Sequence, residues 1–423
     1  MKTVFGLDFG TTNSTLSVNR GGEVGIVDID PTASSKTTIR SVLYFNRARK
    51  VFAGEEAIRQ YLDDNAEGRL IQSIKTLLGS SMFSGVVINN RYYSLEDLIT
   101  VFLRIVKERG ERIIGESVDS VVMGRPAVFS DNTNENRLAE DRLRTATENA
   151  GFKHVVFQFE PIAAGLTYER TFAPGEEKKV LVGDFGGGTS DFTIIKLHGG
   201  TLPEHDRTND VLSLCGIPVG GDIFDSRIMS ERLISYYGAQ AKYKSMRGNW
   251  MEVPTNIFSM LSKWHLTPQL RERKQREDIR QIRGMCNDPV AFERLEDLVD
   301  NNYGFKLFQA IERTKCLLSS QDKAELTFSE LKSEIHEIIT RKEFEAMIAE
   351  DLHRVELSAD EALKSAGLVP DDIDVVFITG GSSSIPSIRN IFIKKFGETK
   401  LASADAFTSV GYGLGIAAQH LFS

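Results

Sequence analysis

Two short stretches of the chain have nearly the same residues, and both suit the binding of phosphate. Residues 8–14 read DFGTTNS and residues 184–191 read DFGGGTSD. Each stretch follows an apolar run that predicts a buried strand, and each precedes a second strand. Glycines allow a backbone to approach a ligand closely, and the amide groups of such a turn can face an anion. We therefore predict two related hairpins that can cradle phosphate.

The carboxylates of these turns suit a metal that accompanies phosphate. Magnesium usually keeps several of its waters, so a carboxylate at the end of a strand can hold the ion through them. Asp8 and Asp184 occupy such positions. A single DFGTT is equally consistent with an ordinary hairpin turn. The second copy, far along the chain, favours two related lobes that share one site.

A third stretch strengthens the case for a nucleotide. Residues 375–392, VVFITGGSSSIPSIRNIF, predict a buried strand, a turn at Gly380 and Gly381, and a helix with Pro386 near its start. Helix N-termini attract phosphate, and glycines let a nucleotide lie against the backbone. The three stretches together predict a nucleotide site.

The elements that must position these residues alternate between strands and helices. Apolar residues at helical spacing, after a Ser94 cap, predict a helix over residues 94–113. This alternation predicts α/β lobes. A polar stretch at about 240–305, which contains both tryptophans, is interpreted as an inserted helical subdomain; a partner surface and a solvated extension both stay open for it. Strands are predicted at 3–8, 14–19, 117–123, 154–160, 180–184, 191–197 and 373–379.

Composition limits the function classes. The 423 residues, with 41% hydrophobic and 26% charged content, suffice for two or more globular domains. A net charge of −8 and a pI near 5.6 argue against bulk electrostatic binding of nucleic acid or an anionic membrane. Three widely spaced cysteines indicate neither a disulfide framework nor a zinc site. Without a signal segment or a long apolar run, we expect a cytoplasmic protein.

Beyond these stretches, further motifs carry a family resemblance over almost the whole chain. The chain resembles the ATPase domain of the seventy-kilodalton heat-shock (DnaK-type) chaperones, within the superfamily that includes actin and hexokinase, and it is most similar to the YegD-type branch. The motifs are IKTLLG (74–79), FEPIAAGLTYE (159–169), VGGDIFD (219–225), IERTKCLLSS (311–320), ITRKEFE (339–345) and DAFTSVGYGLGIAA (405–418).

The resemblance implies an α/β, actin-like ATPase fold. Two lobes with duplicated ribonuclease-H-like cores would enclose a nucleotide cleft. Lobe I would comprise residues 1–172 plus 401–423. Lobe II would comprise residues 173–400, with the helical insertion inside it.

The resemblance also assigns the phosphate side of the site. Lys75 matches the catalytic lysine that positions water and neutralises the γ-phosphate, although the residue alone would be read as an exposed helix lysine. Glu160 would join Asp8 and Asp184 on the waters of magnesium, or else be a helix N-terminal carboxylate. Asp191 would orient or deprotonate water, or anchor its hairpin. The phosphate loops would be Gly10, Thr11, Thr12 and Asn13, and Gly186, Gly187, Gly188 and Thr189.

On the adenosine side the sequence departs from the family. The family has arginines on both faces of adenine, where this chain has Cys316 and Ser384. Loss of two guanidinium planes predicts weaker adenine binding or a looser choice of nucleotide. Glu312 and Lys315 match residues that contact the ribose. The full set of candidates on this side is Gly220, Gly221, Asp222, Glu312, Lys315, Ser319, Gly380, Gly381, Ser382, Ser384 and Asp405.

Two further departures concern coupling to a substrate domain. The chaperones continue into a linker and a peptide-binding domain, whereas this sequence ends at GIAAQHLFS, so we expect no peptide-binding domain. Pro126 matches a proline that the family couples to an arginine. The next helix differs in length and leaves Arg137 and Arg142 as alternative partners.

We therefore expect a magnesium-dependent, slowly hydrolysing ATPase that binds ATP and ADP and switches a partner surface, for example for a co-chaperone. Nucleic acid and membrane are not expected as partners. The alternatives are a small-molecule kinase of the same superfamily, with Asp184 or Asp191 as the base, an actin-like filament protein, and a binding module without useful hydrolysis.

Overall fold

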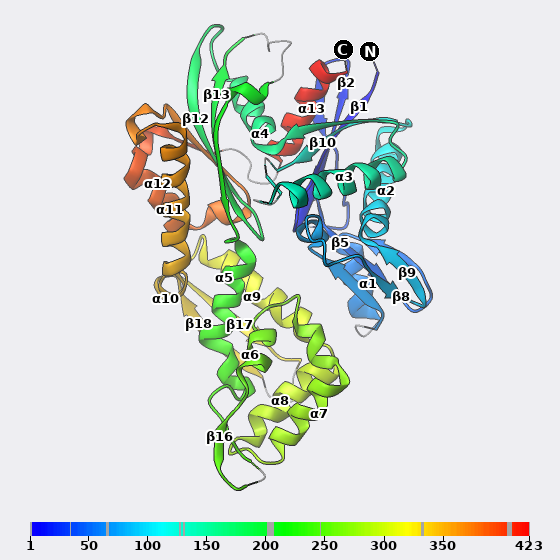
Figure 1. The fold of residues 1–423 in the computed structure, drawn as a ribbon, viewed down its shortest axis with the longest axis vertical. Helices are drawn as coiled ribbons and strands as arrows, with labels where there is room; N and C mark the ends of the chain where they lie inside the picture. Colours follow the sequence, from blue (N-terminus) through cyan, green and yellow to red (C-terminus); the bar gives the residue numbers. More distant parts are fainter. Residues whose placement is uncertain are drawn as a thin grey trace. The chain divides into compact units, whose positions relative to one another are not determined.

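A computed structural model describes residues 2–33, 35–64, 67–126, 128–129, 132–200, 207–245, 247–330, 334–403 and 408–422. The chain divides into two compact units. Unit 1 comprises Met1–Pro218, Val355–Ser384 and Ile388–Ser423, and unit 2 comprises Val219–Arg354 and Ile385–Ser387. Figure 1 shows the elements in the colours of the sequence. The lobe boundaries expected after residues 172 and 400 stay a prediction.

Unit 1 contains a six-stranded sheet formed by the N-terminal part of the chain. Its main path runs β11-β10-β1-β2-β3, and β4 pairs with β2 beside β3. The β1–β2 hairpin is antiparallel, whereas β10 and β11 continue the sheet in parallel. The strands are β1 (Val4–Phe9), β2 (Asn13–Arg20), β3 (Glu23–Ile26), β4 (Thr38–Arg40), β10 (Ser120–Arg125) and β11 (His154–Phe159).

A second sheet in unit 1 repeats this topology. Its order is β14-β13-β12-β19-β20, with an antiparallel β12–β13–β14 meander and with β19 and β20 parallel to β12. Strand for strand, this is the order and direction of β3-β2-β1-β10-β11. The five strands are β12 (Glu177–Phe185), β13 (Ser190–His198), β14 (Val211–Ile217), β19 (Val375–Thr379) and β20 (Leu401–Ser403).

Two helices pack between these sheets, as Figure 1 shows. Helices α4 (Glu160–Glu169) and α13 (Ser409–Leu421) share one buried cluster with apolar side chains of both sheets. Close approach requires glycine here, because a Cβ on Gly413 would lie 1.7 Å from the carbonyl oxygen of Ala163. The α4–α13 contact therefore fixes the helix that begins with Glu160.

The outer face of the first sheet carries a separate core. There α2 (Leu95–Ile114) and α3 (Thr133–Asn149) cover the sheet. The predicted Ser94 cap is confirmed, because Ser94 and Asp97 form a capping box. The other elements of unit 1 are β5 (Val42–Phe45), β6 (Val51–Ala53), α1 (Glu55–Asp63), β7 (Arg69–Gln72), the 3₁₀ turn Ile74–Leu77, β8 (Gly85–Ile88), β9 (Arg91–Ser94), most of α11 (Ala349–Ala366) and of α12 (Pro386–Phe396).

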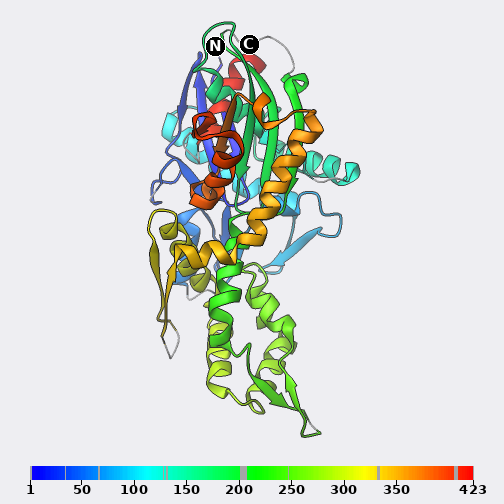
Figure 2. The same cartoon turned by 90° about the vertical axis from the view of Figure 1, so that its left-hand side faces the viewer.

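Unit 2 is mainly helical. The predicted insertion is helical with one short hairpin, as Figure 2 shows. The elements of unit 2 are α5 (Gly221–Ile228), the π turn Met229–Leu233, the 3₁₀ turn Ile234–Tyr237, β15 (Lys242–Lys244), β16 (Trp250–Glu252), α6 (Thr255–Leu261), the 3₁₀ turn Thr267–Arg271, α7 (Arg273–Arg283), α8 (Pro289–Asp300), α9 (Gly304–Leu318), β17 (Lys323–Phe328), β18 (Ile335–Thr340) and α10 (Arg341–Met347).

Helix α7 is polar over most of its surface, and its arginines form ion pairs with carboxylates of α8. Arg276 lies 2.6 Å from Asp300, and Arg280 lies 2.8 Å from Glu296. Ile279 and Ile282 supply a narrow buried face. In the part of the chain that the structure describes, no helix has both the length and the apolar character of a membrane span.

Candidate functional site

Residues from five separate elements of unit 1 form one charged cluster. Asp8 lies in β1, Glu160 begins α4, and Asp184 and Asp191 lie in β12 and β13. Lys75 Nζ lies 2.7 Å from Glu160 Oε1, and the two side chains are only 11% and 12% exposed. Lys75 is therefore not the exposed helix lysine that its sequence alone suggests. It lies in the 3₁₀ turn Ile74–Leu77, and its side chain is largely shielded from solvent.

The carboxylates of this cluster raise one another's pKa. Burial raises the pKa of Asp8 to about 8, and the charges of Glu160 and Asp184 add to the shift while Lys75 opposes it. Burial, Asp191 and Glu160 raise the pKa of Asp184 to about 7. The pKa of Asp191 rises to about 6, mainly by burial. Four carboxylates therefore share one ammonium, and a divalent cation would relieve their repulsion.

The two hairpins have matching turns at this cluster. Phe9 pairs with Ser14, and Phe185 with Ser190, so each hairpin closes through four residues. A Cβ on Gly188 would lie 3.7 Å from Cγ2 of Thr11 and 3.9 Å from that of Thr76, next to Lys75. The predicted phosphate loops therefore face each other beside the lysine.

Both turns leave room and polar atoms for a ligand. A Cβ on Gly10 would lie 2.1 Å from the carbonyl oxygen of Asn13, so the first turn requires glycine at this position. In the second turn the amide of Gly186 donates to the carbonyl of Thr189 (2.9 Å). Thr12 Oγ1 is buried and has no hydrogen-bond partner among the described residues. A phosphate oxygen would satisfy this hydroxyl, so the turns fit the predicted ligand.

The third glycine motif lies against the second hairpin. Gly380 has a φ of 83°. A Cβ there would lie 2.4 Å from the carbonyl oxygen of Phe185 and 2.7 Å from Oδ1 of Asp184. Gly381, Ser382 and Ser384 follow in a 3₁₀ turn, and the helix begins at Pro386, which the sequence predicted near its start. The predicted site residue Asp405 lies outside the described residues.

The other adenosine-side candidates lie in unit 2, at the start of α5 and along α9. Lys315 Nζ donates to the carbonyl of Gly221 (3.1 Å) and to Asp225 Oδ2 (2.8 Å). Burial raises the pKa of Asp225 to about 7 although Lys315 opposes the shift. Gly220 and Asp222 flank Gly221, while Glu312, Cys316 and Ser319 accompany Lys315 on α9 or directly after it. Sequence reasoning missed Asp225, one helical turn after Gly221.

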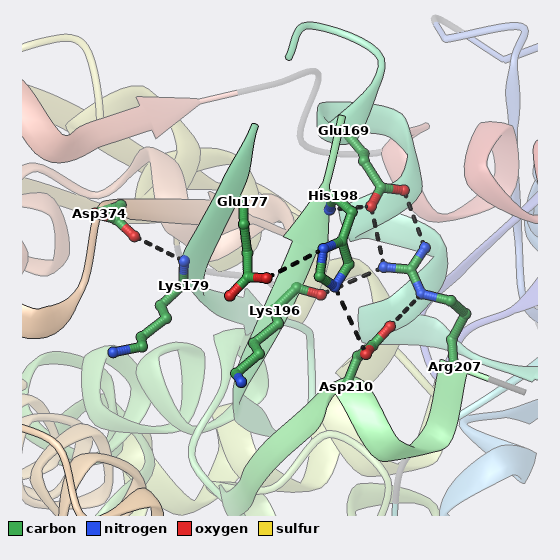
Figure 3. Close-up of polar contacts among 8 residues, drawn as sticks. All are labelled: Glu169, Glu177, Lys179, Lys196, His198, Arg207, Asp210 and Asp374. Carbon is green, nitrogen blue, oxygen red and sulfur yellow. Dashed lines mark hydrogen bonds and ion pairs between the residues drawn. The ribbon is translucent and has the colours of Figure 1, made fainter. Parts of the chain in front are cut away.

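A buried ion pair between Arg207 and Glu169 lies at the ends of α4 and β13 that are remote from the charged cluster, as Figure 3 shows. Glu160 begins α4 and Glu169 ends it; Asp191 lies near the start of β13 and His198 ends it. Arg207 donates to both carboxylate oxygens of Glu169 (3.0 and 3.1 Å). The amide of His198 also donates to Glu169, and Asp210 pairs with Arg207.

The same network reaches the neighbouring strands (Figure 3). Arg207 Nη2 donates to the carbonyl of Lys196 (3.3 Å), and His198 Nδ1 lies 3.5 Å from Glu177. The amide of Lys179 donates to Asp374 Oδ2 (2.8 Å) and thereby links β12 to the residue before β19. Because Arg207 and Glu169 are far apart in sequence, no local pattern predicts this pair.

Arg142 of α3 donates hydrogen bonds to backbone carbonyls of the segment that follows Lys75. Arg142 Nη1 donates to the carbonyls of Leu78 (3.0 Å) and Ser80 (2.9 Å). Arg125 Nε donates to the carbonyl of Pro126 (3.1 Å), and the coupling of Pro126 to Arg137 or Arg142 stays a prediction. The signal for the role of Arg142 is its place on the α3 face that packs on α2.

Pockets of different character occur in the two units. A pocket of about 250 Å³ in unit 1 is lined by Glu160, Asp184, Thr189 and Asp191, with Phe129 and Ile217 among its apolar residues. A pocket of about 580 Å³ in unit 2 runs along α9 and β17, and no candidate residue lines it. Among the described residues, no three histidine, cysteine or acidic side chains can hold a metal directly.

Comparisons with known proteins agree with the geometry. A family model described as "Hsp70 protein" matches residues 4–92, 83–245 and 292–422. The chain is similar to proteins named "Chaperone protein DnaK" from two bacteria. It is 26% identical over 429 residues to that of Thermosipho melanesiensis and 27% identical over 429 residues to that of Thermosipho africanus. Each match covers 99% of this chain and 59% of the relative, so the chain spans about three fifths of these relatives.

Proposed function

The chain belongs to the Hsp70 family, whose members are ATPases with the actin-like fold, and from this premise we propose that residues 1–423 bind ATP and hydrolyse it slowly. Water would be the nucleophile, and magnesium and ADP would complete the nucleotide site. The observation that carries the proposal is the meeting of the two hairpins. Their facing turns lie beside a buried lysine and four carboxylates of unit 1.

The phosphate groups would lie between the two turns. Backbone amides of Gly10 to Asn13 and of Gly186 to Thr189 would hold the phosphate oxygens, and the unpartnered Thr12 hydroxyl supports this placement. Magnesium would neutralise phosphate charge and reach Asp8, Asp184 and Glu160 through its waters. The raised pKa values of Asp8 and Asp184 support a cation at this position.

Lys75 and Asp191 would act on the attacking water. Lys75 would orient the water and neutralise charge that develops on the γ-phosphate. Asp191, which accepts a hydrogen bond from Thr189 (2.7 Å), would take the proton. Because burial raises the pKa of Asp191 to about 6, its carboxylate is a stronger base than an ordinary aspartate, which supports this role.

The contacts proposed for the adenosine rest on the family resemblance. They are Gly380, Gly381, Ser382, Ser384, Asp405, Gly220, Gly221, Asp222, Glu312, Lys315 and Ser319. Lys315 already lies against Gly221, which supports its place beside the ribose. Cys316 is exposed rather than buried against neighbouring side chains. Adenine preference is therefore proposed to be weaker than in relatives that carry arginine at these positions.

The proposal also covers the arrangement of the two lobes and the cellular role of the protein. The repeated strand order of the two sheets supports duplicated cores, and nucleotide-controlled closure of two lobes would switch a surface for a co-chaperone. The names of the relatives support a chaperone-related role. A cytoplasmic location and a place in the YegD-type branch are part of the same proposal. Peptide holding by these residues is not proposed.

The experiment follows phosphate release and protease sensitivity in one preparation. We expect slow, magnesium-dependent release of phosphate from ATP, and cleavage patterns that differ between ATP and ADP. Phosphate transfer to a sugar from a panel would favour the kinase alternative, and ATP-dependent sedimentation would favour a filament. Identical cleavage with and without nucleotide would overturn the switch.

A further inference from the structure

The β15–β16 hairpin of unit 2 is a surface that the nucleotide function does not use. It spans the end of a stretch that the family model matches: β15 lies within the matched residues 83–245, and β16 lies within the unmatched residues 246–291. Figures 1 and 2 show it projecting past the ends of α7 and α8 within its own unit. The edge strand β16 therefore lies outside the matched stretches, which suits a contact that is particular to this chain.

The hairpin is held in place at one edge only. The amide of Lys244 donates to the carbonyl of Met285, and the amide of Asn287 donates to the carbonyl of Lys242, both at 2.9 Å. β15 therefore has β16 on one side and residues 285–287 on the other. Within the described residues β16 has no second neighbour, so its outer edge can accept another strand.

Large apolar side chains lie exposed on this edge strand. Trp250 is 53% exposed and Met251 is 48% exposed. Their side chains point to opposite faces, because neighbours in a strand alternate. Val290, 53% exposed, follows the segment that pairs with β15. Tryptophan and methionine are enriched at protein interfaces.

The same hairpin carries a net positive charge, with three cations and one carboxylate. Lys242, Lys244 and Arg247 are exposed, and no ion pair joins them to a carboxylate among the described residues, although Glu252 lies opposite Lys242 in the register of the hairpin. Lys244 Nζ instead lies 5.2 Å from the centre of the Trp250 ring. By contrast, Arg276, Arg280 and Arg283 of the neighbouring α7 are paired with Glu296 or Asp300 of α8. The hairpin is a cationic patch on a chain of net charge −8.

We propose that this hairpin docks an acidic, partly apolar segment of a partner protein along the edge of β16. Its carboxylates would pair with Lys242, Lys244 and Arg247, and its apolar side chains would cover Trp250 and Met251. Three cations on an acidic chain favour a short acidic peptide over the long phosphate arrays of nucleic acid or an anionic membrane. The inference goes beyond the proposed nucleotide function and does not depend on it.

The test uses Trp250 as its own reporter in the full chain. The chain has two tryptophans, so Trp264→Phe leaves Trp250 as the sole indole. This protein is titrated with a twelve-residue peptide in which glutamate alternates with leucine or phenylalanine, and with a matched peptide in which lysine replaces glutamate. We expect a saturable change in the fluorescence of Trp250 with the acidic peptide. The affinity for this peptide should be at least about tenfold higher than for the basic one.

Variants then assign the binding to the hairpin. Lys244→Glu and Arg247→Glu should each lower the affinity for the acidic peptide about tenfold. Lys274→Glu makes the same charge change at an exposed position of α7 and should leave the affinity unchanged. Trp250→Ala, followed by calorimetry, should lose most binding. Circular dichroism and the melting temperature confirm that each variant folds.

Other outcomes overturn the proposal. Tighter binding of a twelve-nucleotide oligo-dT, or of phosphatidylserine vesicles, with the same dependence on Lys244 would identify nucleic acid or a membrane as the ligand instead. Equal affinity for both peptides, equal loss in Lys274→Glu, or no binding of any probe would remove the acidic segment as the occupant.

Discussion

Replacement of Lys75 by methionine tests the charged cluster of unit 1. The change removes the ammonium that lowers the pKa of Asp8, Asp184 and Asp191, and it leaves Glu160 without its 2.7 Å partner. Breaking a buried ion pair costs about 3–5 kcal/mol. The cost should be at the lower end here, because the neighbouring carboxylates can take up protons.

The effect on catalysis should exceed the effect on binding. Loss of one electrostatic stabiliser of a transition state lowers kcat about 10²- to 10³-fold, which corresponds to about 3–4 kcal/mol. Affinity for magnesium-ADP should change little, because the turns that hold its phosphates stay intact. Single-turnover phosphate release gives the rate, and calorimetry gives the ADP affinity.

Lys395→Met is the matched control. Lys395 is also a shielded lysine of unit 1, 12% exposed against 11% for Lys75, and it pairs with Asp360 on α11. We expect this variant to hydrolyse ATP at the rate of the wild type. If Lys75→Met also kept the wild-type rate while folded and nucleotide-bound, Lys75 would have no part in the chemistry.

Three further perturbations test the framework. Gly413→Ala should cost about 3 kcal/mol or more, because the new methyl meets a backbone oxygen at 1.7 Å. Gly25→Ala is the control, because nothing lies within 4 Å of a Cβ at this position. Its free energy of unfolding in urea should change by less than about 0.5 kcal/mol, and equal losses in the two variants would refute the close approach at Gly413. Arg207→Met should cost about 3–5 kcal/mol, because it leaves buried Glu169 unpaired. The double variant with Glu169→Leu should recover most of this loss, and a double variant as unstable as the single one would contradict the ion pair. In the folded protein Asp225 has a pKa of about 7, so it keeps its proton up to about pH 7. An aspartate of the unfolded chain releases its proton near pH 4. Its contribution to stability is therefore lost as pH rises from about 4 to above 7, and Asp225→Asn should lose less stability than the wild type between pH 5 and pH 8. Equal losses in both proteins would show that Asp225 is not the titrating group.

Local patterns were sufficient for the elements that carry the phosphate side. The strand before each glycine turn, the return strand after it and the Ser94 cap follow from apolar alternation and turn residues, and the structure has all of them. Because the sequence repeats the same turn, it also pointed to the repeated strand order of the two sheets.

Long-range contacts were not readable from the same patterns. IKTLLG resembles a helix segment, yet Lys75 lies in a 3₁₀ turn after Ser73 at a φ of 51°, and its burial depends on Glu160 from another element. Arg207 and Arg142 similarly act on carboxylates or carbonyls distant in sequence. A charged residue's periodicity indicates the face on which it lies, and its partner is set by tertiary packing.

The most direct test of the central claim is a calorimetric titration of the wild type and of Thr11→Ala with Thr189→Ala, using ATP, ADP and GTP with magnesium. The account predicts micromolar or tighter binding of adenine nucleotides by the wild type, a modest preference over GTP, and loss of binding in the double variant. Absence of binding to every nucleotide by the folded wild type would show that the two hairpins are a scaffold without a phosphate site.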